Sequence, residues 1–395
     1  MKISKINLLI LFTMSINAFL SIPLIIVSIL KKKESPFLIG LFFGVLGFYF
    51  QLNGGLGDIG RYYSMFDLPA KARMWTWNYH RDLYAKYMVE FLIKYDLPRY
   101  LLGSTSAFIT YFFSFKSLKI ILDSKKEYSN KERLGIYILF YSLIPIIGYT
   151  GIRFFPALSI ILYSIVLKYK FNNKKYIFFA GISCLVHTSM LLPMLILILS
   201  SNILYVKFFK NIKSIKILSL LLFILGYFFI NSNLVYEVIT LINNIGYIYI
   251  SPMYISGKWG EEYKEQFVGL AKIVRVYIIL NYQKIITLFY GMNIYNKTGL
   301  SIIIIPLTFF YFITQNFRTI SARYFYLLLI IYFIIVIEKR LNLKKLKYKL
   351  FFFMIISYSS GILFLDLKNY ISSFIVSYEA FYKISLLNII KEILF

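Results

Sequence analysis

The chain has 395 residues, of which 59% are hydrophobic, 20% aromatic and only 15% charged, and its formal net charge is +27. Its mean hydropathy is +0.70, whereas a soluble domain is normally about 25% charged and about 45–50% apolar. Such a chain cannot cover itself with polar surface in water. The composition therefore indicates an integral membrane protein and excludes a soluble enzyme, a nucleic-acid-binding domain and a secreted disulfide scaffold.

Apolar runs long enough to cross a bilayer, about 17–25 residues each, recur along the whole chain. The predicted spans are 6–30, 36–52, 100–122, 134–148, 153–168, 217–231, 268–290, 299–315, 320–338 and 350–366. The segment 176–206 is apolar as well and adds one or two crossings. We therefore expect an all-α integral membrane protein of about 11–12 transmembrane helices. Residues 1–395 then form a single polytopic domain. The run 6–30 is expected to be the first span rather than a signal peptide, and no internal repeat is visible.

The short breaks between spans carry most of the lysines, which predicts that these breaks are cytoplasmic. They lie at 31–33, 123–133, 168–175, 207–216 and 339–349. The charge excess is therefore mostly a topology signal, and no nucleic acid is expected as a partner. The same alternation places the N-terminus, the tail after 366 and two sizeable loops, about 53–99 and 232–267, on the outer side.

The segment 176–206 has lysine-rich flanks at both ends, so it must cross the membrane an even number of times. It is short for two full spans at about 1.5 Å per residue. A helical hairpin broken at His187-Thr188-Ser189 fits, and such a break is tolerated only inside protein or beside a wet cavity. The alternative is one long span with an amphipathic continuation along 202–216.

Ten arginines occur in the chain, and only Arg133 and Arg340 fall in predicted cytoplasmic breaks. Arginine offers a planar, permanently charged fork that binds phosphate bidentately, whereas lysine is a point charge. Arginines facing outward therefore indicate an anionic ligand that carries phosphate. The alternative is that each arginine reaches towards lipid headgroups.

Some outward arginines lie where predicted spans begin on the outer side, because spans 100–122, 153–168 and 320–338 run inward. These arginines are Arg99, Arg153, Arg318 and Arg323. A cation at a helix N-terminus opposes the helix dipole at a cost of about 0.3–1 kcal/mol. An anion held between the dipole and the guanidinium would offset that cost.

The first outer loop contains Asp58, Arg61, Tyr62 and Tyr63 in close succession. A carboxylate beside aromatic rings suits sugar binding, since hydroxyls bond to the carboxylate and sugar faces stack on rings. Trp259 adds an aromatic group in the second outer loop. The alternative is an interfacial aromatic loop with a local ion pair.

His187 is an ionisable group at predicted membrane depth, which is a functional hypothesis by default. Its ordinary pKa suits proton transfer. The alternative is a hydrogen-bonded packing residue. The single cysteine, Cys184, and the two histidines offer no disulfide framework and no metal cage, and no metal or cofactor is expected.

Three segments together resemble the EpsG/Wzy type of bacterial O-antigen and exopolysaccharide repeat-unit polymerases. They are Asp58-x-x-Arg61-Tyr62-Tyr63-x-x-Phe66, Gly151-Ile152-Arg153-Phe154-Phe155-Pro156-Ala157-Leu158 and Leu185-Val186-His187-Thr188-Ser189. The order of these elements covers most of the chain, although the motifs are short and degenerate. Phe154, Phe155 and Pro156 depart from the more polar residues often found in that family.

The resemblance implies a metal-independent glycosyltransferase of the membrane-embedded GT-C kind in the bacterial plasma membrane. It would move a growing glycan from undecaprenyl diphosphate onto a lipid-linked repeat unit, and the resemblance implies a chain-length regulator protein as a further partner. On this hypothesis Arg153, His187 and Asp58 are catalytic, and Tyr62, Tyr63 and Trp259 bind sugar. The diphosphate would be held by Arg153, Arg318, Arg323 and Arg61. The alternatives are a flippase or ion-coupled carrier, and a ligase that attaches finished glycan to a lipid core.

Overall fold

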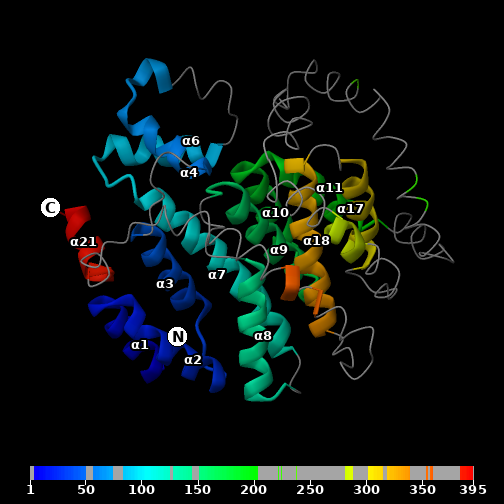
Figure 1. Cartoon of the computed structure of the whole chain (residues 1–395), viewed down its shortest axis with the longest axis horizontal. Helices are drawn as coiled ribbons and strands as arrows, with labels where there is room; N and C mark the ends of the chain where they lie inside the picture. Colours follow the sequence, from blue (N-terminus) through cyan, green and yellow to red (C-terminus); the bar gives the residue numbers. More distant parts are fainter. Residues whose placement is uncertain are drawn as a thin grey trace, which may run out of the picture. The chain divides into compact units, whose positions relative to one another are not determined.

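A computed structural model describes residues 4–49, 57–73, 83–124, 128–144, 151–202, 281–287, 301–314, 318–338, 353–354, 356–358 and 383–394, with the single residues 221, 224 and 237. Within these residues the secondary structure is helical, without strands (Figure 1). The chain forms two compact units. The first unit is Met1–Met194 with Ser359–Phe395, and the second is Leu195–Tyr358. A single polytopic domain stays a prediction.

The first unit begins with an interrupted helix. Helix α1 (Lys5–Ile16) ends at Asn17, and a 3-10 turn η1 (Ala18–Ser21) leads into α2 (Ile22–Leu30). Residues of α1 and α2 contact each other, although at about 1.5 Å per residue a straight helix would hold them too far apart. The run 6–30, predicted as the first span, is therefore two helices with a break between them, and its crossing of the membrane stays a prediction.

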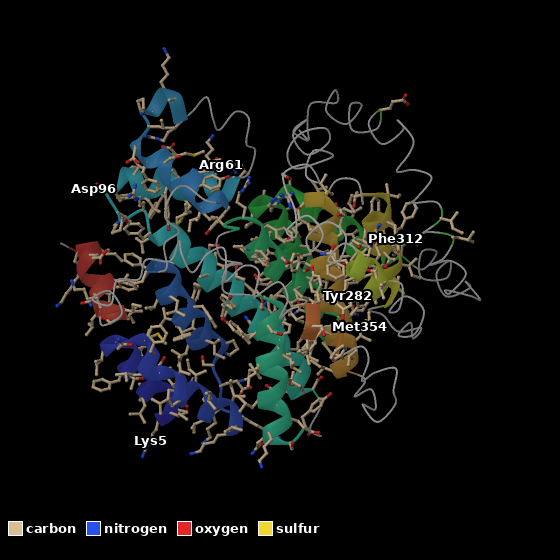
Figure 2. The ribbon with its side chains drawn as sticks, viewed as in Figure 1. Lys5, Arg61, Asp96, Tyr282, Phe312 and Met354 are labelled. Atoms are coloured by element: carbon tan, nitrogen blue, oxygen red, sulfur yellow. The ribbon has the colours of Figure 1, made fainter. Side chains whose placement is uncertain are left out.

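The membrane side of each end of this unit stays a prediction. Figure 2 shows Lys5 and Arg61 at opposite ends of the first unit. The sequence analysis places the N-terminus on the same outer side as the loop that carries Arg61, and that placement stays a prediction.

A row of glycines joins α3 (Pro36–Tyr49) to α7 (Leu101–Asp123). Gly40, Gly44 and Gly47 lie on one face of α3, and a Cβ built on any of them would meet atoms of α7. At Gly47 that Cβ would lie 2.7 Å from the carbonyl oxygen of Gly103, and the reverse distance is also 2.7 Å. Small residues spaced in this way let two helix backbones approach closely, as in membrane helix pairs.

A cap of short helices follows α3 in the chain. It comprises α4 (Gly57–Ser64), the 3-10 turn η3 (Met65–Asp67) and α6 (Leu83–Lys94). Three side chains of α4 are buried on one face, those of Ile59, Tyr62 and Tyr63, which is the spacing of an amphipathic helix. A Cβ on Gly103 would lie 3.0 Å from the Tyr63 hydroxyl oxygen and 3.1 Å from Ile59 Cδ1. The glycine of α7 therefore also makes room for α4.

Four further helices belong wholly or partly to the first unit: α8 (Asn130–Leu143), α9 (Phe154–Phe171), α10 (Lys175–Val186) and α11 (Leu191–Leu199). Helix α9 packs on α7 and α10. Between α10 and α11 the helix breaks at His187, and a 3-10 turn η5 (Thr188–Met190) follows. This confirms the predicted interruption of 176–206, whereas the folding back of α11 onto α10 stays a prediction.

A buried ion cluster joins the loop before α3 to the facing ends of α7 and α8. Glu34 and Arg133 are 1% and 2% exposed. Glu34 Oε1 accepts hydrogen bonds from Arg133 Nε at 3.0 Å, from Arg133 Nη2 and from the Tyr137 hydroxyl at 3.0 Å. Arg133 also pairs with Asp123. This cluster lies where the sequence predicts cytoplasmic breaks.

The C-terminal helix α21 (Leu386–Leu394) packs on α1 and α3. The Ala18 N–H donates to the Ile384 carbonyl at 2.8 Å, and the Tyr49 hydroxyl donates to the Ser385 carbonyl at 3.4 Å. The chain end is thus bound directly to the helix break after Asn17.

In the second unit, α17 (Ser301–Ile313) packs on α18 (Arg318–Glu338). Two helices in the described part of the chain, Phe154–Phe171 and Ile320–Glu338, are long and apolar enough to cross a membrane. They coincide with two of the predicted spans. The other apolar helices are shorter, between 10 and 17 residues.

The glycine contact generates a first prediction. Gly103→Ala or Gly47→Ala places a methyl group against a backbone oxygen, and such overpacking typically costs about 1–3 kcal/mol. We expect a lower thermal unfolding midpoint for both variants in detergent, measured by tryptophan fluorescence. The controls are Gly135→Ala and Gly181→Ala, where nothing lies within 4 Å of the new Cβ, so stability should hold or rise. Equal midpoints for all four variants would contradict the tight contact.

The ion cluster generates a second prediction. Glu34→Ala leaves Arg133 buried without its main partner, and breaking a buried pair typically costs about 3–5 kcal/mol. The double variant Glu34→Leu/Arg133→Met removes both charges and should cost clearly less. Thermal unfolding of both variants checks this, with Lys33→Ala on the exposed neighbouring lysine as a control. A double variant at least as unstable as the single one would refute the paired-charge account.

Candidate anion-binding site

Two arginines from separate parts of the sequence meet at one buried tyrosine ring. Arg61 Cζ lies 5.2 Å from the ring centroid of Tyr62, and Arg153 Cζ lies 5.3 Å from the same centroid. Tyr62 is completely buried, and Arg153 is only 4% exposed. A guanidinium within about 6 Å of a tyrosine ring is attracted by the ring's electrons, more strongly when water is excluded. The ring of Tyr62 therefore attracts two positive charges from different parts of the sequence.

The fold explains why these residues meet. The buried face of α4 places Tyr62 towards the unit's interior, and Gly103 on α7 makes room for the neighbouring Tyr63. Arg153 is the residue immediately before α9, so it is fixed by the start of that helix. The Ser106 hydroxyl of α7 donates to the Ile152 carbonyl at 3.3 Å and ties this start to α7.

A third arginine lies beside the next two aromatic rings. Arg99 Cζ lies 5.9 Å from the Tyr63 centroid and 5.5 Å from the Tyr100 centroid. It also forms an ion pair with Asp67 at 3.5 Å. The two tyrosine rings are themselves in edge contact, with centroids 5.7 Å apart. We call Arg61, Arg99, Arg153 and the rings of Tyr62 and Tyr63 the arginine–tyrosine cluster.

The phenol of Tyr63 is a neutral group in this cluster. Burial raises its pKa well above the usual range, more than the nearby Arg99 lowers it. Tyr63 therefore stays protonated at physiological pH. The cluster gathers three arginines, and α9 adds the positive end of a helix dipole next to Arg153, which is the end of a helix that favours anions.

His187 lies close to this cluster through the residue after Arg153. The His187 and Phe154 rings meet edge to face, with centroids 6.0 Å apart. His187 is 5% exposed, and its Nδ1 accepts a hydrogen bond from the Ser189 N–H at 3.1 Å. The structure thus brings Arg61, Arg153 and His187 into one region of the first unit, although their roles stay predictions.

The remaining predicted residues are described to different extents. Asp58 lies on α4, three residues before Arg61, and the structure describes its backbone. Arg318 opens α18, and Arg323 lies on the same helix; both belong to the second unit. Trp259 lies outside the described residues.

The predicted positions of arginines at helix starts are confirmed for Arg99, Arg153 and Arg318. Sugar binding by Tyr62 and Tyr63 stays a prediction. Their burial favours a different task, which is to hold the arginines in place. Tyr100 and Gly103 were not singled out from the sequence. An aromatic residue next to Arg99 and a glycine in the first turn of a span are the signals that could have found them.

Comparison with known proteins gives no relative, since no family model, curated protein or solved structure matches the chain.

The shared ring generates a third prediction. Tyr62→Leu removes the surface that holds both guanidinium groups, whereas Tyr62→Phe keeps it. Two desolvated contacts of this kind are each worth roughly 0.5–2 kcal/mol, so Tyr62→Leu should weaken anion binding by about tenfold or more. The measurement is titration of the detergent-solubilised protein with inorganic pyrophosphate. The aromatic account would be refuted if Tyr62→Phe lost as much affinity as Tyr62→Leu.

Proposed function

We propose that the protein is a membrane-embedded glycosyltransferase that polymerises lipid-linked oligosaccharide repeat units at the outer face of the bacterial plasma membrane. It would take part in making O-antigen, capsule or exopolysaccharide. The observation that carries this proposal is the placement of Arg61 and Arg153 on one buried ring beside His187. The multi-pass architecture and the resemblance to EpsG/Wzy polymerases belong to the proposal as well.

The donor in this reaction is a growing glycan linked to undecaprenyl diphosphate. A diphosphate has two adjacent phosphoryl groups, and two guanidinium groups held by one ring would each bind one of them with paired hydrogen bonds. Negative charge builds on the diphosphate as its bond to the sugar breaks. Arg61 and Arg153 would stabilise that charge in the transition state, in surroundings that exclude water and so strengthen the interaction.

The acceptor is a hydroxyl at the non-reducing end of a new lipid-linked repeat unit. Its oxygen forms a bond to the anomeric carbon of the donor while the bond from that carbon to the phosphate oxygen breaks. The hydroxyl proton passes to a base, and the diphosphate leaves with the electron pair. Asp58 or His187 would orient or deprotonate this hydroxyl, and Asp58 lies on the same helix as Arg61.

Arg318 and Arg323 are proposed as further diphosphate ligands, and Trp259 as a sugar contact. Arg318 lies at the N-terminus of a 21-residue helix, the end of a helix that favours anions. Each of these roles is open to separate test by substitution, independently of the arginine–tyrosine cluster.

A second candidate is a flippase for lipid-linked oligosaccharide. The observation that favours it is the pair of interrupted helices, at Asn17 and at His187, because transporters commonly build their sites from broken helices. A ligase that attaches finished glycan to a lipid core would use the same arginine and histidine chemistry as a polymerase. The products that accumulate distinguish the three functions.

Arg153→Lys tests the proposed chemistry because it keeps the charge and removes the fork. Removing one such donor typically costs about 10²–10³-fold in rate, so we expect loss of most polymer. The assay uses purified protein in proteoliposomes with lipid-linked repeat units, and products are resolved on a gel. Arg73→Lys is the control for loss of an arginine outside the arginine–tyrosine cluster, since Arg73 Nε pairs with Glu90 Oε1 at 3.2 Å. Full activity of Arg153→Lys would contradict bidentate binding.

A further inference from the structure

One side of α7 changes from aromatic to cationic along the helix. Phe108, Phe112, Lys116 and Lys119 follow one another at intervals of four, four and three residues, which places them on one side of a helix. All four are partly exposed, whereas the other sides of α7 are largely buried. From the first of these residues to the last the helix rises about 16 Å, close to half of a hydrocarbon core of about 30 Å. This side therefore has the length and the change of polarity of one lipid leaflet.

The ammonium group of Lys116 is held between two aromatic rings. Its Nζ lies 5.1 Å from the ring centroid of Phe112 and 4.6 Å from that of Tyr163 on α9. Within the described part of the chain it has these ring contacts and no carboxylate partner. The rings attract the charge, but a cation at predicted membrane depth also needs hydrogen-bond acceptors and a counter-charge. The rings thus fix an ammonium group whose own donors suit an anion.

Lys119 brings a second ammonium group to the same side of α7. Its Nζ donates to the backbone carbonyl of Glu34 at 2.7 Å, and among the described residues it forms no ion pair. The Glu34 carboxylate is paired with Arg133 instead. Two lysines three residues apart are neighbours on a helix surface. They lie towards the predicted cytoplasmic end of α7, where neither charge is neutralised by a described carboxylate.

An apolar surface adjoins the two lysines. The rings of Phe108 and Phe112 are stacked, with centroids 5.6 Å apart. Phe37 at the start of α3 meets both rings edge to face, at 5.5 and 6.4 Å, and is 53% exposed. A Cβ on Gly40 would lie 2.8 Å from Phe112 Cβ, so α3 and α7 are closely paired beneath this surface. We call Lys116, Lys119 and the rings of Phe37, Phe108 and Phe112 the lysine–phenylalanine face.

We propose that the lysine–phenylalanine face binds an anionic phospholipid of the cytoplasmic leaflet, which rests on the proposed function only for the membrane location. The lipid phosphate lies at the two lysines, and an acyl chain covers the three rings. Basic pockets beside membrane helices on the cytoplasmic side are sites of this kind for anionic headgroups. Because the lipid contacts α3 and α7 together, it stabilises the helix pair that positions the arginine–tyrosine cluster.

The direct test is lipid binding to the purified full chain in detergent, by native mass spectrometry and by the thermal unfolding midpoint. The probes are dioleoyl phosphatidylglycerol, dioleoyl phosphatidylcholine with the same acyl chains, and inorganic phosphate. We expect phosphatidylglycerol to remain bound and to raise the midpoint more than either other probe. An equal effect of phosphatidylcholine would show acyl contacts without anion recognition, and an equal effect of inorganic phosphate would show a site for free phosphate. Either result would overturn the proposal.

Substitutions test the two lysines. One lysine beside an anionic lipid surface corresponds to about fivefold in affinity, so Lys116→Gln should weaken phosphatidylglycerol binding by about fivefold and Lys116→Gln/Lys119→Gln by about twentyfold. Lys116→Arg keeps the charge and should keep the affinity. The control is Lys131→Gln, on an exposed lysine of α8 on the same predicted side. Wild-type affinity in Lys116→Gln, or an equal loss in Lys131→Gln, would refute the site, and Lys116→Gln decides alone if the double variant does not fold.

The apolar half of the site has its own test. Phe37→Ala removes an exposed ring, so we expect it to leave the lipid-free midpoint in place and to weaken binding of dioleoyl phosphatidylglycerol. The control is Phe178→Ala on α10, which removes a ring that is 66% exposed outside this face. Equal affinities for the two variants would contradict the placement of the acyl chain.

The lipid site and the polymerase proposal fail in different ways. If phosphatidylglycerol binds as expected but the wild-type protein makes no polymer, the polymerase proposal fails and the lipid site stands. If polymer forms but Lys116→Gln binds phosphatidylglycerol as the wild type does, the polymerase proposal stands and the lipid site is refuted.

Discussion

The contact between Gly47 and Gly103 is the constraint on which the arrangement of the first unit depends. Any side chain at either position would meet a backbone oxygen at 2.7 Å, so the close approach of α3 and α7 needs glycine on both helices. The same absence of a side chain at Gly103 admits Tyr63 and Ile59 of α4. The cap helix that carries Arg61 and Tyr62 is therefore positioned by a contact that contains no functional group itself.

Two like charges on one buried ring are a costly arrangement unless something compensates them. The ring's attraction offsets part of that cost, and the Asp67 carboxylate beside Arg99 adds a negative charge at the edge of the cluster. A bound diphosphate would supply more. This cost supports the proposal that the cluster binds an anion, since packing alone would be served by neutral side chains. Arg153 is held in place because it directly precedes helix α9.

Part of this arrangement could be predicted from the sequence, because it depends on local signals. Arg153 and Arg318 stand where apolar runs begin, and His187 interrupts another run, so the helix ends are correct. The contacts between distant segments could not be predicted, since nothing in residues 40–47 says that their partner is Gly103. The break at Asn17 was missed because one asparagine in an apolar run is a weak signal, and Pro23 comes six residues later.

The measurement that tests the central claim most directly is deletion of the gene, with the lipid-linked and surface polysaccharide resolved on a gel. The account predicts that the deletion strain carries lipid core with a single repeat unit, and that the wild-type gene restores a ladder of longer chains. Loss of every repeat at the surface, with lipid-linked units accumulating inside, would indicate a flippase, and finished polymer stranded on its lipid carrier would indicate a ligase. An unchanged ladder would contradict all three assignments and with them the proposed use of the arginine–tyrosine cluster.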